Sequence, residues 1–253
     1  MPTDIIFLDI RTALPVPTSP NTWKIRLTLN YKRLQYRTQW CSTTAIESTC
    51  KPLGIPPTGI KPDGAPHYTL PAIIDRTNPE HPVYLSDSLP IIEYLEKTYP
   101  SPPGKELFPA HTKAFQSIFN NVVMPKLYLA LQDLGISALH KAKMPGDQKD
   151  FEARILARTG KHWESLEKQG DERENSFKAL QGTLSMLRAA CEKSGEGEYL
   201  MGRQISFADL ALCSWFITIK TTSPDDIWAR IISWDGGKWV RYVDSFQEWM
   251  AVH

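Results

Sequence analysis

"LPVPTSPNTWKIRLTLNY", residues 14–31, is the stretch that decides the fold of the first half of this chain. The apolar side chains of Trp23–Leu29 alternate as in a strand, but they also lie four residues apart as in a helix. Ser19 followed by Pro20 resolves this ambiguity, because a serine N-cap and a proline in the first helical position are typical of a helix start. The stretch therefore predicts a helix that begins at Pro20 and continues through Tyr31.

The segments on either side of this helix predict a small α/β domain. Apolar or alternating runs indicate strands at residues 5–10, 34–40, 68–75 and 83–85. The segment "SDSLPIIEYLEKTYP" reads as a helix that Ser88 caps and Pro100 stops. The predicted order is β, α, β, a long loop, β, β, α.

The second half of the chain has helical patterns only. The breaker-rich stretch "SPPGKELFPAH" reads as a linker. Helices are predicted over residues 111–139 with a break or kink at Pro125, over the charged residues 148–170, and over residues 174–193. Ser206 and Asp209 form a capping box before a segment that is apolar on every side, which indicates a central buried helix. We expect a domain over residues 1–100, a linker over 101–111, and an all-helical domain over 112–253.

Composition and charge exclude several classes of function. The 29 basic and 28 acidic residues nearly cancel, so no global field favours nucleic acid or a membrane surface. Four cysteines without metal-ligand spacing indicate free thiols in a reducing compartment, and no metal site is expected. The N-terminus lacks the pattern of a secretory signal, and no membrane-spanning segment is expected. These features predict a cytoplasmic protein.

Four motifs in this order resemble the glutathione transferase superfamily. They are Ser19-Pro20 at the first helix, Leu70-Pro71 before the third strand, Asp87-Ser88 at a later helix, and "SFAD" at the start of the buried helix. The resemblance implies a thioredoxin-like domain followed by an all-α bundle, and it covers nearly the whole chain. The stretch "SPNTWKIRLTLNYK" and the loop "KPLGIPPTGIKPDGAPHYTLPAI" are similar to the fungal-specific (FuA, etherase-related) class.

The resemblance implies that glutathione is the cosubstrate and that its thiol is activated at the first helix. Ser19 and Thr22 occupy the positions where thioredoxin has its redox cysteines, so the chain has no redox nucleophile of its own there. A helix N-terminus favours an anion, and the glutathione thiol supplies one. Ser19 would donate a hydrogen bond to the sulfur, and Asn21 is the second candidate donor. By itself, Ser19-Pro20 is also an ordinary helix start.

The resemblance also assigns residues to the rest of the tripeptide. Leu70, before a cis Pro71, would pair with the cysteinyl backbone of glutathione. Asp87 and Ser88 would receive its γ-glutamyl end, although the same pair is also a standard helix cap. His67 and Lys61 are candidates for its glycyl carboxylate.

The aromatic residues of the second domain suggest a site for a hydrophobic acceptor. The candidates are Phe115, Phe119, Tyr128 and Trp215, each of which is otherwise a core residue. The leading function is therefore attack of the glutathione thiolate on aromatic electrophiles, including wood-derived ethers and phenolics. The alternative is a non-catalytic ligandin that carries hydrophobic aromatic compounds. A hydrolase with Ser19 as nucleophile is the weaker third reading, because no G-x-S-x-G motif surrounds that residue. The resemblance implies a homodimer.

Overall fold

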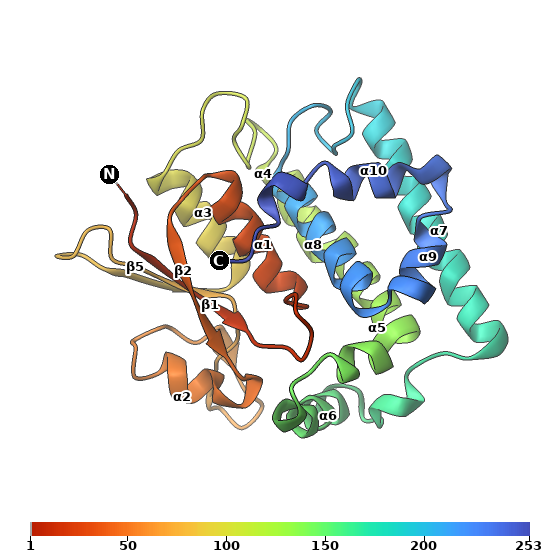
Figure 1. Ribbon diagram of the computed structural model, residues 1–253, viewed down its shortest axis with the longest axis horizontal. Coiled ribbons are helices and arrows are strands. Elements are labelled where there is room, and N and C mark those ends of the chain that lie inside the picture. The colour runs from red at the N-terminus through yellow and green to blue at the C-terminus, as the bar shows by residue number, and fades with distance from the viewer. Residues whose placement is uncertain (1) are drawn as a thin grey trace.

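The N-terminal domain is built on a four-stranded mixed sheet in a computed structural model that describes residues 2–253 (Figure 1). The strand order is β2–β1–β5–β6; β1 runs parallel to β2 and antiparallel to β5, and β6 is antiparallel to β5. The strands of the sheet are β1 (Ile5–Ile10), β2 (Tyr36–Cys41), β5 (Ala72–Asp75) and β6 (Val83–Ser86). A separate short hairpin is formed by β3 (Gly59–Ile60) and β4 (Pro66–His67).

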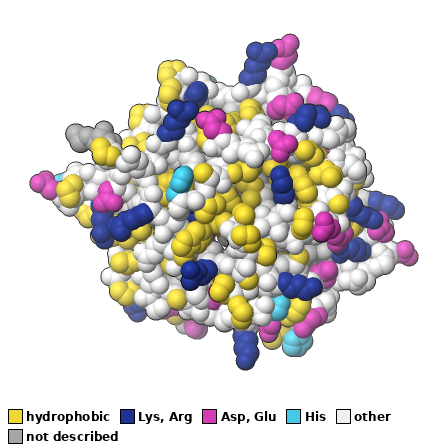
Figure 2. All heavy atoms as spheres, viewed as in Figure 1, with side chains coloured by type: hydrophobic (Ala, Val, Ile, Leu, Met, Phe, Trp, Pro, Cys, Tyr) yellow, Lys and Arg dark blue, Asp and Glu magenta, His cyan; other side chains and the backbone are white. Residues whose placement is uncertain are grey.

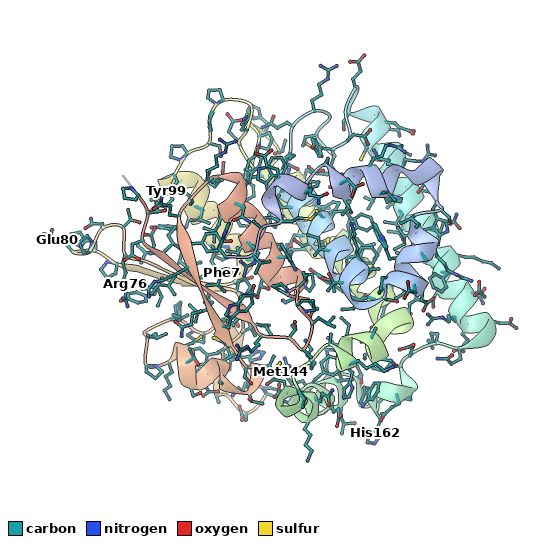
Figure 3. All side chains as sticks on the ribbon, in the orientation of Figure 1. Phe7, Arg76, Glu80, Tyr99, Met144 and His162 are labelled. Atoms are coloured by element: carbon teal, nitrogen blue, oxygen red, sulfur yellow. The ribbon has the colours of Figure 1, made fainter. Side chains whose placement is uncertain are left out.

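Helices cover both faces of this sheet. They are α1 (Pro20–Tyr31), α2 (Ile46–Cys50) and α3 (Ser88–Thr98). Successive residues of β1 point to opposite faces, so Phe7, labelled in Figure 3, lies in the core shared with α1 and α3. Leu8 lies in the smaller core around α2. This arrangement agrees with the thioredoxin-like domain that the resemblance implies.

The predicted helix after Ser19 is confirmed as α1. All residues from Thr22 to Leu29 are buried, because α1 lies between the sheet on one side and α8 (Phe207–Thr222) on the other. A helix that is covered on all sides does not have to separate polar from apolar residues, and in α1 Lys24, Arg26 and Thr28 are buried among the apolar side chains. Its sequence periodicity is therefore weak, which is why the spacing of Trp23–Leu29 fitted a strand equally well.

The C-terminal domain is all-helical, as expected. Besides α8, its helices are α4 (Lys113–Ile118), α5 (Met124–Lys141), α6 (Pro145–Thr159), α7 (Gly170–Lys193), α9 (Ala229–Ile231) and α10 (Lys238–Asp244). The central buried helix is confirmed: α8 is buried from Phe207 to Ile219 and packs on α1 and α5 (Figure 1). The capping box is confirmed too, because Ser206 donates through both its backbone N–H and its hydroxyl to the Asp209 carboxylate.

Three predicted boundaries are wrong. The charged segment 148–170 is not one helix: α6 ends at Gly160, whose φ of 68° suits glycine, and a short 3-10 turn follows at Trp163–Ser165. The break in the segment 111–139 is a π-helical stretch at Phe119–Val123, just before Pro125. The strand predicted over residues 68–75 is only β5, because within residues 2–253 the backbone of Leu70 has no partner in the sheet and pairing begins at Ala72.

One helical path has the length and apolar composition of a membrane-crossing helix, contrary to expectation. It runs over residues 113–141 and comprises α4, the π-helical stretch and α5. A helix packed into the core of a globular domain meets the same criteria, and α5 packs on α7 and α8. The outer side of the path nevertheless leaves apolar residues exposed: Phe115, Ile118, Val122 and Leu129. We refer to these four residues as the outer stripe.

The cysteines are buried, and the surface carries charges of both signs. All four cysteines are free and buried, and burial raises the pKa of Cys50 and of Cys191 to about 11. Residues 2–253 contain no cluster of side chains that would hold a metal ion. Figure 2 shows basic and acidic side chains interspersed around the rim of one face, with apolar side chains gathered near its centre.

Candidate active site

Ser19 is the N-cap of α1, as predicted. Its Oγ accepts a long hydrogen bond of 3.4 Å from the backbone N–H of Thr22, and its carbonyl accepts the N–H of Trp23 at 3.0 Å. The Ser19 hydroxyl proton has no acceptor among residues 2–253, and neither has the backbone N–H of Asn21. Two donors therefore remain available at the positive end of the helix dipole.

The loop that leads into Ser19 is held by the core of the protein. The indole N–H of Trp23 donates to the carbonyl of Pro17 at 2.7 Å. From α8, the hydroxyl of Thr218 donates to the carbonyl of Thr18 at 3.1 Å. Because both donors are buried, the position of Ser19 is fixed from the sheet domain and from the helical domain.

The second element of the site is the segment Leu70-Pro71. Its peptide bond is cis, as the resemblance implies. The carbonyl of Pro71 accepts the backbone N–H of Asp87 at 3.1 Å, which brings the two predicted motifs together. Within residues 2–253 the backbone N–H and C=O of Leu70 have no hydrogen-bond partner, so this short extended segment can pair with an added peptide.

Asp87 and Ser88 form the start of α3. The Asp87 side chain accepts the backbone N–H of Ser88 at 2.6 Å, while Asp87 itself is exposed and Ser88 is buried. Asp87 has φ 73° and ψ 139°, a conformation that is strained for any residue with a side chain. Strained residues of this kind cluster at binding sites, and here the strain presents a free carboxylate edge beside the cis-proline segment.

The sequence analysis missed Lys24, a buried cation one turn into α1. Lys24 is only 3% exposed, and its Nζ donates to the side-chain oxygens of Asn21 at 3.1 Å and Asn120 at 3.2 Å. Burial lowers the pKa of Lys24 to about 8, and the nearby charge of Asp87 opposes that shift. The available signal was that the basic residues Lys24 and Arg26 alternate with apolar residues in a helix predicted to pack into the core. Lysine is almost never fully buried without a reason.

The lowered pKa of Lys24 predicts how stability depends on pH. The ammonium is disfavoured in the folded state, since the pKa falls from 10.5 to about 8, so it opposes folding below pH 8. This cost disappears as the pH rises from 8 toward 10.5, because the unfolded chain then binds more protons than the folded one. Between pH 7 and 9.5 we expect the unfolding free energy of the wild type to rise by about 2 kcal/mol relative to Lys24→Met. Denaturant titrations of both proteins measure this difference, and parallel pH profiles would contradict it.

Comparison with known proteins places these features in a family. The family model described as the N-terminal domain of glutathione S-transferase matches residues 15–103, and the model of the C-terminal domain matches residues 114–249. The chain belongs to the glutathione S-transferase family. Glutathione is the cosubstrate of this family, and Ser19, Leu70 and Asp87 all lie within the matched N-terminal domain.

Solved structures of fungal glutathione transferases are similar over the whole chain. Glutathione transferase GSTFuA3 from Phanerochaete chrysosporium is 36% identical with a TM-score of 0.89, covering 100% of this chain and 99% of that one. The transferase CsGST63524 of Ceriporiopsis subvermispora, solved in complex with glutathione, is 31% identical with a TM-score of 0.88 and 98% coverage of both chains. The glutathione S-transferase-like protein ustS of Aspergillus flavus is 28% identical over 96% of this chain and 90% of its own length.

Lys61 and His67, predicted to meet the glycyl end of glutathione, both belong to the short hairpin region of this glutathione transferase. Lys61 is half-buried and forms an ion pair with Glu47 at 2.8 Å. His67 is exposed, and its carbonyl accepts the backbone N–H of Thr58 at 2.8 Å. The loop that leads into this hairpin is held near Asp87, because the hydroxyl of the neighbouring Ser86 donates to the carbonyl of Pro56 at 2.8 Å.

The four predicted acceptor residues of this transferase lie in different environments. Tyr128 is half-buried, and its hydroxyl donates to the Asn21 side chain at 3.2 Å, so it lies beside the start of α1. Phe115 is 38% exposed and belongs to the outer stripe. Phe119 and Trp215 are 1% and 0% exposed, and the indole of Trp215 donates to the carbonyl of Leu127. Among these four, only Tyr128 contacts a predicted catalytic residue.

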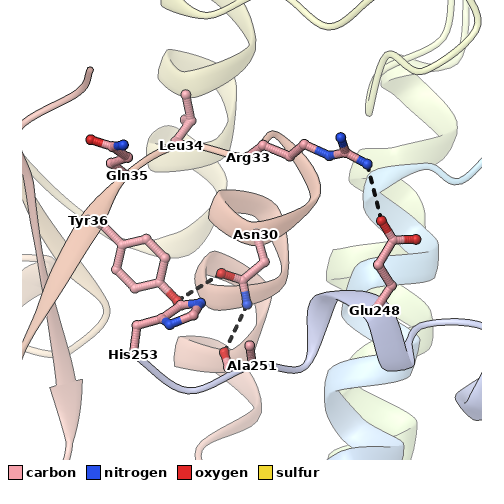
Figure 4. Close-up of a pocket in the computed structure, with 8 residues that line it drawn as sticks. All are labelled: Asn30, Arg33, Leu34, Gln35, Tyr36, Glu248, Ala251 and His253. Atoms are coloured by element: carbon pink, nitrogen blue, oxygen red, sulfur yellow. Dashed lines mark hydrogen bonds and ion pairs between the residues drawn. The ribbon is translucent and has the colours of Figure 1, made fainter.

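A separate hollow of about 410 Å³ lies at the other end of α1 (Figure 4). It is lined by residues of the α1–β2 turn and of the C-terminal segment, including Asn30, Tyr36 and His253. Asn30 donates to the carbonyl of Ala251 at 2.9 Å, and the Tyr36 and His253 rings pack edge to face at 5.8 Å. Asn30 lies eleven residues beyond Ser19, which at 1.5 Å per helical residue is about 16 Å. This hollow is therefore distinct from the candidate active site.

Proposed function

We propose that this chain is a serine-type, etherase-related glutathione transferase in which Ser19 stabilises the thiolate of bound glutathione. The observation that carries the proposal is the Ser19 hydroxyl, whose proton has no acceptor among residues 2–253 although it stands at a helix N-terminus. The backbone N–H of Asn21 adds a second such donor. Preorganised donors of this kind favour a negatively charged sulfur over a neutral thiol.

The groups left without protein partners fit the parts of the tripeptide. In this proposal the Leu70 backbone pairs with the cysteinyl residue as an added strand does. The exposed Asp87 carboxylate accepts the γ-glutamyl ammonium, while Ser88 and the start of α3 take the α-carboxylate. His67 and Lys61 meet the glycyl carboxylate, for which Lys61 has to exchange its ion pair with Glu47.

The reaction that follows is a substitution on an aromatic electrophile. The thiol proton goes to solvent, and the thiolate sulfur attacks the electrophilic carbon beside an aryl ether. The new C–S bond forms as the bond from that carbon to the ether oxygen breaks, and the phenolate leaves and is protonated by solvent. We propose wood-derived aryl ethers and phenolics as the substrate class, with Tyr128 on the acceptor side because its half-buried ring lies beside the start of α1.

Titration of the bound thiol tests the role of Ser19. We expect Ser19→Ala to raise the apparent pKa of the glutathione thiol by about one unit, which is about 1.4 kcal/mol of lost preference for the thiolate. Thiolate absorbance of the glutathione complex measures this shift as a function of pH. Ser233→Ala is the matched control, since Ser233 is an exposed serine that only donates to the carbonyl of Arg230. An unchanged apparent pKa in Ser19→Ala would remove Ser19 from the mechanism.

The carrier function receives less support than the sequence suggested. Its case rests on the eight tryptophans as stacking surfaces for flat ligands. Trp23, Trp215, Trp228 and Trp239 are buried, and Trp40 is the only exposed one. Most of the indole surface is therefore already used in packing. Calorimetric binding of phenolics without measurable turnover of model electrophiles would favour the carrier over the enzyme.

We also propose that the chain is a homodimer and that the outer stripe is part of its interface. Phe115, Ile118, Val122 and Leu129 are spaced by three, four and seven residues, so they lie on one side of the α4–α5 path. An exposed apolar stripe of this length is typical of an interaction surface. The proposed boundaries of the two domains, 1–100 and 112–253, put the stripe in the helical domain. The four free cysteines support our proposal of a cytoplasmic location, because thiols stay reduced in that compartment.

A charge in the outer stripe is expected to separate the dimer. Val122→Glu places a carboxylate in a desolvated interface, so the mass in solution should fall from twice the chain mass to 28.7 kDa. Light scattering during size-exclusion chromatography measures this mass. Met186→Glu is the control, because Met186 is an exposed apolar residue on α7, outside the stripe. Equal masses for Val122→Glu and the wild type would place the interface elsewhere.

A further inference from the structure

The side-chain amide of Asn21 is oriented by two donors. Lys24 Nζ and Tyr128 OH both donate to its Oδ1, at 3.1 Å and 3.2 Å. An ammonium group has no acceptor, so the oxygen of the amide must face Lys24 and the NH2 must face away from it. The Nδ2 of Asn21 consequently lies on the open side, and it has no acceptor among residues 2–253.

Tyr128 keeps its proton at neutral pH, and Lys24, whose pKa burial lowers to about 8 against the opposing charge of Asp87, is mostly protonated there. Burial raises the pKa of the Tyr128 phenol above its usual value, so the hydroxyl stays protonated. The Lys24 ammonium is held only by amide oxygens, those of Asn21 and Asn120, and the described chain places no carboxylate within 4 Å of it. The ring of Tyr128 lies 6.0 Å from Lys24 Nζ. Lys24, Tyr128 and Asn21 thus form one connected cluster between α1 and α5.

We propose that Lys24 and Tyr128 are positioning residues that aim Asn21 Nδ2 at the sulfur of bound glutathione. The inference rests on the proposed function, since the thiolate is the acceptor that Nδ2 lacks in the protein. The positive charge of Lys24 also stabilises the thiolate through the amide of Asn21. A charged donor on Oδ1 polarises the amide and makes Nδ2 a stronger hydrogen-bond donor. Asn21 sits two residues after Ser19, so the two side chains supply donors from the same turn of α1.

If Lys24, Tyr128 and Asn21 served folding alone, their substitution would have a different effect from the one we propose. The cluster also joins α1 to α5, and a merely structural link would change stability without changing the bound thiol. The distinguishing quantity is therefore the apparent pKa of the glutathione thiol on the protein. The affinity for S-methylglutathione, which has no ionisable sulfur, reports the binding of the remainder of the tripeptide.

A double-mutant cycle between Asn21→Ala and Tyr128→Phe tests the inference. We expect Asn21→Ala to raise the apparent thiol pKa by about one unit and Tyr128→Phe by about half a unit. The double variant should match Asn21→Ala alone, because Tyr128 acts only through the amide. Lys24→Met should also raise the thiol pKa, and S-methylglutathione should bind to all variants within about threefold of the wild type. Tyr31→Phe is the control, since Tyr31 lies at the far end of α1 and its hydroxyl donates to the carbonyl of Lys105.

The possible outcomes separate this inference from the proposed function. A wild type that leaves the thiol pKa at its value in free glutathione overturns the proposed function, and the inference with it. A wild type that lowers the thiol pKa, together with a Tyr128→Phe variant that leaves it unchanged, overturns the inference alone. Additive shifts in the double variant do the same, because they show that Tyr128 acts independently of Asn21. Tyr128→Phe removes a single hydroxyl, so the cycle can be read even where Lys24→Met does not fold.

Discussion

Asp209→Ala is expected to lower the unfolding free energy by about 4 kcal/mol, the largest effect of any substitution considered for this chain. The Asp209 carboxylate is fully buried and accepts four hydrogen bonds. The donors are the backbone N–H groups of Leu200 (2.8 Å) and Ser206 (2.9 Å), and the hydroxyls of Ser206 (2.7 Å) and Tyr242 (3.0 Å). Truncation leaves these buried donors without an acceptor, and each unsatisfied group costs about 1 to 3 kcal/mol before the site relaxes.

Thermal and denaturant unfolding of the variant measures this loss. For a chain of this size we expect a melting temperature about 10 °C lower than that of the wild type. Asp225→Ala is the matched control: Asp225 is an exposed acidic residue in the first turn that follows α8, and it should change stability by less than about 0.5 kcal/mol. A melting temperature within 2 or 3 °C of the wild type would show that water enters the site and replaces the carboxylate.

The reason that Asp209 matters for function is the position of α8 behind α1. Asp209 fixes the start of α8, and Thr218, two turns further along this helix, holds the carbonyl of Thr18 beside Ser19. The capping box therefore supports the loop that presents the Ser19 hydroxyl. The capping box at the start of α8 and Thr218 in its last third therefore belong to one packed helix, which positions the loop that carries Ser19.

The two helices that decide the fold were predictable because their start signals are local. The Ser19-Pro20 dipeptide and the Ser206/Asp209 capping box act within four residues, so they can be recognised without tertiary information. The periodicity of α1 was uninformative for the opposite reason, since burial on both sides removes the polar face that a pattern search needs. Where the periodicity fitted a helix and a strand equally well, the capping signal gave the correct answer.

Interior boundaries were harder, because they depend on backbone geometry. The left-handed Gly160 ends α6 within a run of charged residues that continues to residue 170; a glycine at this position is a recognised stop signal, but the continuing charge pattern outweighed it. The π-helical stretch Phe119–Val123 has no recognisable sequence signal ahead of Pro125. In both places the hydrophobic and charged patterns persist while the hydrogen bonding of the backbone changes.

The candidate site was only partly predictable, since its residues are distant in sequence. Pro71 and Asp87 are joined by a backbone hydrogen bond across β5 and β6, and only the family resemblance brought the two motifs together before the fold was known. Lys24 was missed because a lysine in an amphipathic helix usually extends to solvent. Its burial follows from α5, whose residue Tyr128 lies more than one hundred positions further along the chain.

Asp87→Asn is expected to weaken glutathione binding about 100-fold, or about 3 kcal/mol, by removing the charge that the proposal assigns to the γ-glutamyl ammonium. This substitution isolates the effect of the charge, because we expect it to leave the backbone at position 87 unchanged. Asparagine caps a helix as well as aspartate and has nearly the same shape, so the backbone strain at φ 73° is unchanged and the bond to the Ser88 N–H is retained while the charge is lost. Isothermal titration calorimetry with glutathione measures the change in affinity.

A ligand that lacks the ammonium group distinguishes two explanations for weaker binding. Either Asp87 recognises the ammonium charge, or its substitution disturbs the site in general. Glutaryl-cysteinylglycine has the same chain as glutathione but lacks its α-amino group, so Asp87→Asn should bind it no more weakly than the wild type does. Glu93→Gln, which removes an exposed carboxylate from the same helix, should leave the affinity for glutathione within about twofold. Equal losses for both ligands would mean that Asp87 acts by shaping the start of α3, because an aspartate that only holds the backbone cannot sense whether the ammonium is present.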